Sequence, residues 1–183
     1  SGYVDVEFKV GNGYAGKTLV AYETISLGSP AIISHKDIND KDQSITINPH
    51  PTLPTSKATD KKDGDQKLSY RGGTVNDVVD YTSLIVGTEY RMEGELMNKA
   101  TGKSTGIKSS VTFKPTSENG KVTVPFTVGD NFPNTTFVAF QRLYQGTTLI
   151  AKHENINNKD QTVTTPDYPE MDLSTKARDK ADG

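Results

Sequence analysis

The chain has 183 residues, no cysteine and a formal net charge of −2, with lysines and acidic residues mixed along its length. The absence of cysteine excludes disulfides and thiolate metal sites. The lack of a basic stretch argues against a nucleic-acid partner. No apolar run approaches the roughly 20 residues of a membrane span, so we expect no membrane-spanning segment in this sequence.

The sequence repeats itself with a shift of about 118 residues. Residues 4–47 return as residues 122–165. A second echo relates SKATDKKDG, which begins at Ser56, to TKARDKADG, which begins at Thr175. Arrays of one recurring module usually extend, display or link other domains. The repeat therefore favours a structural protein.

The phase of the repeat predicts three parts. Residues 1–49 are the C-terminal part of one repeat, residues 54–166 are a complete β-sandwich repeat, and residues 170–183 are the first strand of the following repeat. Prolines between these parts are typical of stiff connectors. Because unpaired strand edges and a half-built core are costly, we expect only the complete repeat to fold by itself and neighbouring sequence to complete the other parts.

The local patterns are those of strands. Some segments alternate apolar and polar residues, and others are rich in β-branched and aromatic residues. Glycine and asparagine turns separate them, and no segment shows a long helical period. In chain order the strand-like segments are residues 4–10, 18–22, 44–47, 122–128, 136–140 and 162–165. Short strands with frequent turns predict an all-β chain of immunoglobulin-like β-sandwich modules in tandem.

Both copies share short sequence elements. VAYE at residues 20–23 returns as VAFQ at residues 138–141, and each copy ends with a histidine, seven further residues and a glutamine. Together with EYRMEGELMNKATGK from Glu89, these elements resemble the VaFE-type repeats of Gram-positive surface adhesins. The resemblance implies immunoglobulin-like modules of a wall-anchored stalk. It also implies an intramolecular ester bond between a threonine on the first strand and a glutamine on the last.

The residues support this chemistry. A hydroxyl is a weak nucleophile that needs a neighbouring base, and histidine suits that role near neutral pH. His153 stands eight positions before Gln161 across a polar loop. Two carboxyls in a low-dielectric core can share a proton, and the protonated one can donate a hydrogen bond to the amide carbonyl. We predict that His153 is the base and that Gln161 is the acyl donor.

The family resemblance implies a carboxyl pair, made by an aspartate in a DxxxY-like strand and the glutamate that ends VaFE. The matching residues are Asp77 and Gln141. Glutamine donates a hydrogen bond but cannot relay a proton, so we expect slow or absent bond formation in this repeat. The first, partial repeat keeps Glu23 together with His35 and Gln43.

Two residues compete for the nucleophile. Thr55 fits by its distance to Asp60 and because the family residue is a threonine, whereas Ser56 fits by its alignment with Thr175. We prefer Thr55 and keep Ser56 as the alternative. By the same alignment, Thr175 would react with a glutamine that follows this sequence.

These observations predict a stalk repeat of an extracellular, cell-wall-anchored surface adhesin. It would cross-link itself once without being a turnover enzyme, and it needs no cofactor or metal. The acidic loop at residues 37–42 lacks the glycine and glutamate of an EF-hand, which argues against calcium. The expected partners are neighbouring repeats of the array, with a host surface protein or glycan bound through another domain.

Two alternatives remain open. The first is an isopeptide-cross-linked, pilin-like domain that joins Lys57 to Asn155. The second is a ligand-binding adhesin module in which exposed Tyr81, Arg142 or Tyr144 contacts a host molecule.

Overall fold

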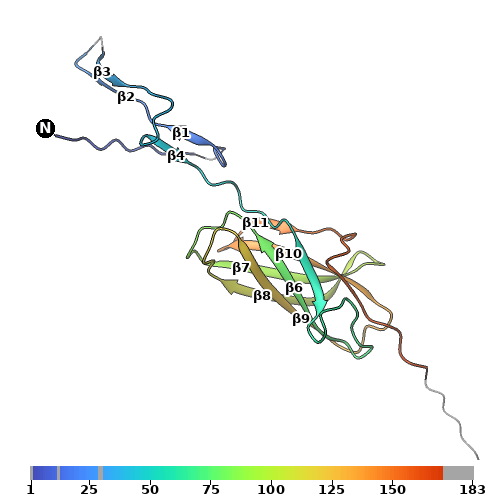
Figure 1. Cartoon of the computed structure of the whole chain (residues 1–183). Coiled ribbons are helices and arrows are strands. Elements are labelled where there is room, and N and C mark those ends of the chain that lie inside the picture. The colour runs from blue at the N-terminus through green and yellow to red at the C-terminus, as the bar shows by residue number, and fades with distance from the viewer. Residues whose placement is uncertain (1, 12, 29–30, 171–183) are drawn as a thin grey trace, which may run out of the picture. The chain divides into compact units, whose positions relative to one another are not determined.

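The computed structural model describes residues 2–11, 13–28 and 31–170, and it divides into two compact units (Figure 1). Unit 1 is Ser1–Pro51 and unit 2 is Thr52–Gly183. The described residues form strands and contain no helix, and hence none long and apolar enough to span a membrane. The prediction of an all-β chain is therefore confirmed. Thr175 and nearly all of the predicted strand at 170–183 lie outside the described residues.

Residues 52–170 of unit 2 form two antiparallel sheets. The first sheet has the order β5-β6-β9, with strands Ser56–Asp60, Gly73–Tyr81 and Gly120–Val128. The second has the order β11-β10-β7-β8, and β12 also pairs with β10. In chain order its strands are β7 at Tyr90–Asn98, β8 at Lys103–Phe113, β10 at Thr136–Gln145, β11 at Thr148–His153 and β12 at Thr162–Thr164.

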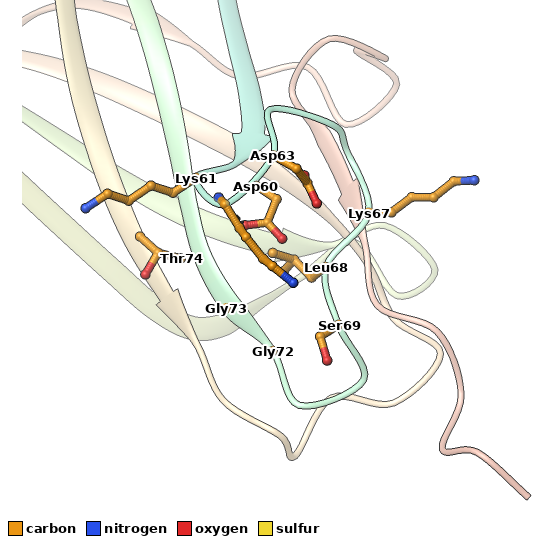
Figure 2. Close-up of a pocket in the computed structure, with 10 residues that line it drawn as sticks. Asp60, Lys61, Asp63, Lys67, Leu68, Ser69, Gly72, Gly73 and Thr74 are labelled. Atoms are coloured by element: carbon orange, nitrogen blue, oxygen red, sulfur yellow. Dashed lines mark hydrogen bonds between the residues drawn. The ribbon is translucent and has the colours of Figure 1, made fainter.

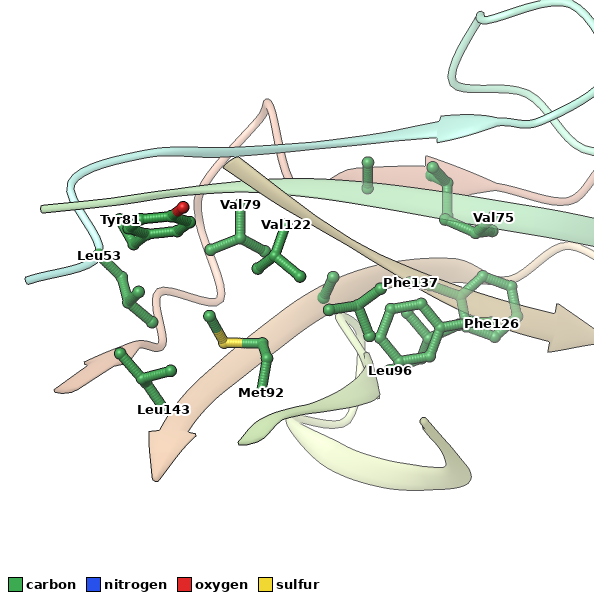
Figure 3. Packing of buried hydrophobic residues seen from close by; sticks show 14 of the residues in the cluster. Leu53, Val75, Val79, Tyr81, Met92, Leu96, Val122, Phe126, Phe137 and Leu143 are labelled. Carbon is green, nitrogen blue, oxygen red and sulfur yellow. The ribbon is translucent and has the colours of Figure 1, made fainter. Parts of the chain in front are cut away.

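The core of unit 2 lies between the two sheets (Figure 3). Side chains alternate between the two faces of a strand, so every second residue of β6 and of β7 is buried. Val75 and Val79 of β6 belong to the same buried cluster as Met92 and Leu96 of β7. Asp77 falls in phase with the two valines and is completely buried. The alternation that builds the core thus also carries a carboxyl group into it.

Backbone hydrogen bonds bring the first strand of unit 2 to its last segment. The Ala58 amide donates to the Asp160 carbonyl over 2.9 Å, and the Leu68 amide donates to the Thr164 carbonyl over 2.7 Å. The Gln66 side chain adds a hydrogen bond of 3.1 Å to the Asp160 carbonyl. Residues about one hundred positions apart therefore lie side by side, with β5 and β12 in different sheets.

The described residues of unit 1 form four short strands in two antiparallel pairs. β1 pairs with β4 and β2 pairs with β3. Their bounds are Thr18–Val20 for β1, Glu23–Ser26 for β2, Ala31–His35 for β3 and Ser44–Thr46 for β4. None of the residues whose burial is described in unit 1 is buried. Two-stranded ribbons without a core are marginal in water.

The same sequence pattern gives different structures in the two units. Residues 122–128 lie in β9, which pairs with β6 over nine residues. Residues 4–10, which carry the same alternation, form no strand, so the prediction of a strand there is wrong. A strand needs a neighbour for its backbone groups, and the described part of unit 1 offers no counterpart of β6.

We expect the two units to differ in resistance to proteolysis, because backbone segments with few buried contacts open easily. Limited trypsin digestion of the chain should cleave within residues 2–51 well before it cleaves within β5–β12, and mass spectrometry should find a resistant core close to the predicted repeat at 54–166. Equal resistance along residues 2–165 would show that unit 1 is already paired and that these boundaries are wrong.

Candidate functional site

Asp77 is a buried carboxyl at the centre of β6. It stands opposite Ala58 of β5 and Val124 of β9. Burial raises the pKa of Asp77 to about 6, because a low-dielectric surrounding disfavours the charged form. The hydrogen bond from Gln141, the nearby Ser56 hydroxyl and the charge that His153 carries when it is protonated act in the opposite direction and lower the pKa. The effect of burial on the pKa is larger than the effects of these three groups, so the pKa of Asp77 stays at about 6.

Gln141 joins the second sheet to Asp77. It lies on β10, opposite Gly94 of β7 and His153 of β11. Its Nε2 donates a hydrogen bond of 2.7 Å to Asp77 Oδ2, and the whole residue is buried. A Cβ atom at Gly94 would lie 2.4 Å from Phe126 Cζ and 3.0 Å from Gln141 Nε2. Glycine at this position therefore leaves the room that the buried amide occupies.

Ser56 and Thr55 face opposite sides of the first sheet. Ser56 is buried at the start of β5. Its hydroxyl lies near enough to Asp77 to lower the pKa of that carboxyl, but it has no hydrogen-bond partner among the described residues. Thr55 is exposed, and its hydroxyl donates to Asp80. Lys121 also binds Asp80, and these two contacts lower the pKa of the Asp80 carboxyl.

Gln161 is completely buried beside β5. The carbonyl of its neighbour Asp160 accepts the Ala58 amide, and its own carbonyl accepts the Ala139 amide over 2.9 Å. These backbone contacts fix Gln161 between β5 and β10. Neither Nε2 nor Oε1 of its side chain has a hydrogen-bond partner in the described part of the chain.

Unpaired polar atoms gather in this part of the core. They are Ser56 Oγ, Asp77 Oδ1, Gln141 Oε1 and both amide atoms of Gln161, and none has a partner among the described residues. A buried polar group without a partner costs about 1–3 kcal/mol. Such a concentration in one core is unusual and needs an explanation. We name Ser56, Asp77, Gln141 and Gln161 the buried polar cluster.

His153 lies at the end of β11, and two contacts hold its ring. Nδ1 lies 2.9 Å from the Leu53 carbonyl oxygen, and Nε2 lies 2.9 Å from Asn158 Nδ2. A carbonyl only accepts and an amide nitrogen only donates, so the ring carries its proton on Nδ1 and accepts at Nε2. Leu53 precedes β5, so this contact also places the ring near the start of the first strand.

Asn158 was missed in the sequence analysis, although the repeat contains a signal for it. In unit 1 the corresponding residue is Asp40, and its carboxylate lies 3.0 Å from His35 Nε2. A histidine followed five positions later by an aspartate or asparagine thus occurs in both copies. The spacing places a side-chain oxygen or amide against the same ring nitrogen.

Unit 1 brings its predicted residues together. Glu23 of β2 stands opposite His35 of β3, as Gln141 stands opposite His153 in unit 2. Gln43 Nε2 donates to the Glu23 carboxylate. A carboxyl, a histidine and an amide are therefore assembled here, but the described part of unit 1 holds no counterpart of Ser56 or Asp77.

The residues of the two alternative functions lie outside the buried polar cluster. Lys57 and Asn155 are both exposed. Tyr81 was expected to be exposed, and this is wrong: it is buried and packs against Phe113, with ring centroids 5.5 Å apart. Tyr144 lies beneath the Arg91 guanidinium, 5.1 Å from it.

Arg142, the remaining residue of the ligand-binding alternative, is held by two carboxylates. Its guanidinium contacts Glu95 over 3.2 Å and Glu154 over 2.6 Å. These ion pairs raise the pKa of Arg142 against the opposing effect of burial. The guanidinium is therefore already engaged within the protein.

No group of histidine, aspartate or glutamate among the described residues is arranged to hold a metal ion. In the acidic loop, Asp37 and Asp40 each accept a backbone amide two positions further on. Such bonds are typical of Asx turns. The carboxylates of this loop therefore shape its backbone.

A hollow of about 570 Å³ lies at the end of β5 away from Ser56 (Figure 2). Asp60 and Leu68 lie in its wall, and Asp60 accepts the Lys62 amide over 2.9 Å. The side chains of Lys61 and Lys67 extend in opposite directions in Figure 2. Because these charges do not converge on one point, we assign no ligand to the hollow.

The family match to this chain falls into two segments that correspond to unit 1 and unit 2. A family model described as "T-Q ester bond containing domain" matches residues 1–47 and 51–165. No curated protein matches the sequence significantly.

Two solved structures share the fold. Both are crystal forms of a bacterial adhesin from Mobiluncus mulieris that contains intramolecular disulfide, isopeptide and ester bond cross-links. The TM-scores are 0.56 and 0.54 at 15% and 16% identity. In each case the match covers 65% of this chain and 58% of the adhesin chain. The predicted resemblance to ester-bond adhesin domains is confirmed.

The raised pKa of Asp77 makes the stability of uncross-linked unit 2 depend on pH. Folded protein retains a proton up to about pH 6 that unfolded protein releases near 3.8. The free energy of unfolding should therefore fall as the pH rises through this window, by at most about 3 kcal/mol for a shift of about two units. Urea unfolding of the Ser56→Ala variant between pH 3.5 and 7 measures this contribution.

The matched control is the double variant Ser56→Ala/Asp77→Asn, which keeps all other carboxyls. The difference between the two variants isolates Asp77 from groups such as Glu95 and Glu154, whose pKa values are lowered and act in the opposite sense. Parallel pH profiles for the two variants would contradict the assignment.

Proposed function

Because the chain belongs to the family of T-Q ester bond containing domains, we propose that unit 2 joins its first strand to its last through an ester between Ser56 and Gln161. The observation that carries this proposal is the buried polar cluster. A hydroxyl, a carboxyl oxygen and a complete carboxamide stand unpaired in one core. Reaction between them would explain why such costly groups are buried together.

The reaction is an acyl transfer within one chain. Ser56 Oγ attacks Gln161 Cδ, an O–C bond forms, the C–N bond breaks, and ammonia leaves with the hydroxyl proton. Asp77 titrates near pH 6, so its protonated form is available to donate from Oδ1 to the Gln161 carbonyl oxygen. Such donation stabilises the developing oxyanion. The nucleophile and the acyl group both belong to the chain and are consumed in the ester, so each domain reacts once and is not a turnover enzyme.

Ser56 supports this role better than Thr55. Ser56 faces the core beside Asp77, whereas Thr55 points to solvent and is engaged by Asp80. The next position into β5, Lys57, is exposed again. Adjacent residues of a strand face opposite sides, so only one of the two hydroxyls can face Gln161. A serine hydroxyl performs the same chemistry as the threonine of related domains.

His153 is proposed as the base that moves the hydroxyl proton. Its neutral ring accepts a hydrogen bond at Nε2 from Asn158. To take a proton there, Nε2 must exchange the Asn158 amide for the Ser56 hydroxyl. The contact between Nδ1 and the Leu53 carbonyl holds the tautomer that leaves Nε2 as the acceptor.

Gln141 occupies the place of the second carboxyl. Its Nε2 donates to Asp77 Oδ2, a contact that favours the ionised form of Asp77. A glutamate would instead share a proton with Asp77 and favour the protonated form. The presence of glutamine instead of glutamate at position 141 therefore slows the proposed reaction, but the nucleophile and the acyl donor remain in place.

The cross-link would close a loop of about 105 residues and, on the chain-entropy model used for disulfides, stabilise the fold by roughly 4.7 kcal/mol. The cross-link would also carry mechanical load. Because it ties the strands where tension enters and leaves, force applied to the two ends of unit 2 would pass through a covalent bond.

The two solved structures that share the fold are crystal forms of one bacterial adhesin. By this similarity, unit 2 is proposed to be a stalk repeat of an extracellular surface adhesin anchored to the cell wall of a Gram-positive bacterium. Its partners would be neighbouring repeats of the same array, and a host protein or glycan would be bound by another domain.

We expect intact-mass measurement of folded protein to show the loss of one ammonia, with tandem spectra that join the Ser56 peptide to the Gln161 peptide. Ser56→Ala should abolish this loss, and Thr55→Ala should retain it, because only the first hydroxyl faces the core. Loss of the cross-link in Thr55→Ala alone would reverse the choice of nucleophile. An unmodified mass in both wild type and Gln141→Glu would remove the ester.

Gln141→Glu should accelerate bond formation, because it restores a carboxyl that shares a proton with Asp77. The conversion rate in a time course from newly refolded protein should rise by about 100-fold, the lower end of what a positioned acid or base contributes. Gln141→Leu is the matched control, since leucine fills a similar volume but has no titratable proton to share with Asp77. Equal rates for wild type and Gln141→Glu would mean that Asp77 suffices.

His153→Ala should abolish cross-linking and leave a folded sandwich, because the ring lies at the edge of the core and its proposed role is proton transfer. Circular dichroism checks the fold, and intact mass checks the bond. Asn158→Ala, which frees Nε2, should keep or raise the rate. Full cross-linking of His153→Ala would exclude histidine as the base.

A further inference from the structure

The outer face of the second sheet of unit 2 carries an ion-pair bridge from β7 and β10 to the end of β11. Arg142 Nη1 lies 3.2 Å from Glu95 Oε2, and Arg142 Nε lies 2.6 Å from Glu154 Oε1. Glu95 belongs to β7 and Arg142 to β10, and Glu154 comes directly after β11. We name Glu95, Arg142 and Glu154 the outer ion triad.

The outer ion triad is shielded from water more than an ordinary surface ion pair. The side chains of Glu95 and Glu154 are 12% and 16% exposed, and that of Arg142 is 33% exposed. Lys108 lies 3.5 Å from Glu95, and Lys152 lies 2.9 Å from Glu154. Partly buried ion pairs are screened much less than exposed ones. The triad therefore constrains the strands that carry it more than exposed pairs would.

The triad lies behind the buried polar cluster, on the other face of the same sheet. Arg142 follows Gln141 on β10, and Glu154 follows His153. Adjacent residues of a strand face opposite sides, so Gln141 points into the core while Arg142 points outward. Gln141 stands opposite His153 in the register of β10 and β11. The ion pair between Arg142 and Glu154 thus joins the outer face of the two strands that bring Gln141 and His153 together.

Glu154 stands where the pairing of β11 with β10 stops. His153 is the last residue of β11, and its pair with Gln141 is the last of that ladder. The loop that follows carries Asn158, whose amide nitrogen lies 2.9 Å from His153 Nε2. The Glu154 carboxylate therefore fixes the chain between the histidine and the loop that contacts its ring.

The sequence repeat shows that the hairpin forms without these charges. By the repeat, Arg142 and Glu154 correspond to Thr24 and Lys36 of unit 1, which cannot form the same ion pair. β2 and β3 nevertheless pair in the register of β10 and β11. What the ion pair adds in unit 2 is therefore the placement of the chain beyond the hairpin ladder, where the histidine ring is held.

We propose that Arg142 and Glu154 are positioning residues for the cross-linking reaction and that they act through His153. This inference rests on the proposed function, in which the His153 ring is the base. Both side chains lie on the outer face of the sheet, away from the reacting atoms. Their ion pair holds the end of β11 so that Nδ1 stays against the Leu53 carbonyl, the contact that keeps Nε2 as the acceptor. A ring that loses this carbonyl can take either tautomer.

The first measurement follows the ring without the reaction. In the Ser56→Ala variant, which cannot form the proposed ester, nitrogen NMR of the imidazole reports which ring nitrogen carries the proton. We expect a single His153 tautomer with the proton on Nδ1. Adding Arg142→Gln or Glu154→Gln should give a mixture of the two tautomers, because the contact with the Leu53 carbonyl is then no longer enforced.

The second measurement follows the reaction. With Ser56 in place, Arg142→Gln and Glu154→Gln should each slow the conversion seen by intact mass by about tenfold or more, since a misplacement of about 1 Å costs up to about 100-fold. The time courses are run in wild type and in Gln141→Glu, so that slow conversion of the wild type does not hide the effect. Arg142→Lys keeps a cation between the two carboxylates and should retain most of the rate.

Arg91→Gln is the matched control. Arg91 also lies on the outer face of the second sheet, where its Nε is 3.0 Å from Glu93 Oε1. It stands opposite Tyr144, away from the pair of Gln141 and His153. The control therefore removes an arginine–glutamate pair of the same sheet, and it should leave both the tautomer and the rate unchanged.

A loss of stability alone would not support the proposal. Circular dichroism and urea unfolding check each variant, and Glu154→Gln, which keeps the shape of its side chain, decides the matter if Arg142→Gln does not fold. An unchanged tautomer and rate in a folded Arg142→Gln or Glu154→Gln variant would overturn the positioning role. Equal effects of Arg91→Gln and Arg142→Gln would overturn it too. Failure of the proposed function looks different: no cross-link forms in wild type or Gln141→Glu, while the tautomer in Ser56→Ala still shows whether the triad positions the ring.

Discussion

The hydrogen bond from the Ala58 amide to the Asp160 carbonyl is the contact on which the site depends. It holds the first strand of unit 2 against the segment that carries Gln161. Two residues before Ala58, the alternation of the strand turns Ser56 into the core, and one residue after Asp160 the backbone turns Gln161 inward. A pair of residues more than one hundred positions apart is thus aligned before any covalent chemistry takes place.

The core accepts polar groups at a cost that a reaction would remove. Asp77 shares its strand with Val75 and Val79, and its burial raises its pKa to about 6. Gln141 compensates in part through the hydrogen bond that links the two sheets. The unpaired atoms of Ser56 and Gln161 remain. Formation of an ester would convert a hydroxyl and a primary amide into one less polar group and would release as ammonia the amide nitrogen for which the described core offers no hydrogen-bond partner.

The sequence predicted the fold better than the details of the site. Period-two alternation in residues 122–128 identified β9 correctly, since one face of that strand is buried by a complete partner sheet. The same alternation failed for residues 4–10, because pairing depends on a neighbouring strand that a local pattern does not reveal. The repeat and the VAF element identify Gln141, His153 and Gln161 as candidate site residues from the sequence alone.

The choice between adjacent hydroxyls needed the register of β5. Thr55 and Ser56 differ by one position, and one position reverses the face to which a side chain points. Tyr81 is buried for a related reason: it lies at the inward phase of β6, at the point where Phe113 of β8 covers it. The sequence indicates Asn158 only through a spacing after histidine that both copies share. The contact of its amide with His153 Nε2 shows that it holds the ring.

The most direct test of the central claim is the length of chain that unit 2 releases under force. In single-molecule stretching, a domain whose Ser56 is joined to Gln161 should unfold without extending the loop between them. Roughly 350 Å of contour, or about 105 residues at 3.3–3.6 Å each, should therefore be missing. Ser56→Ala should restore that length. Full extension of the wild-type domain, equal to that of Ser56→Ala, would contradict a covalent link between the first and last strands.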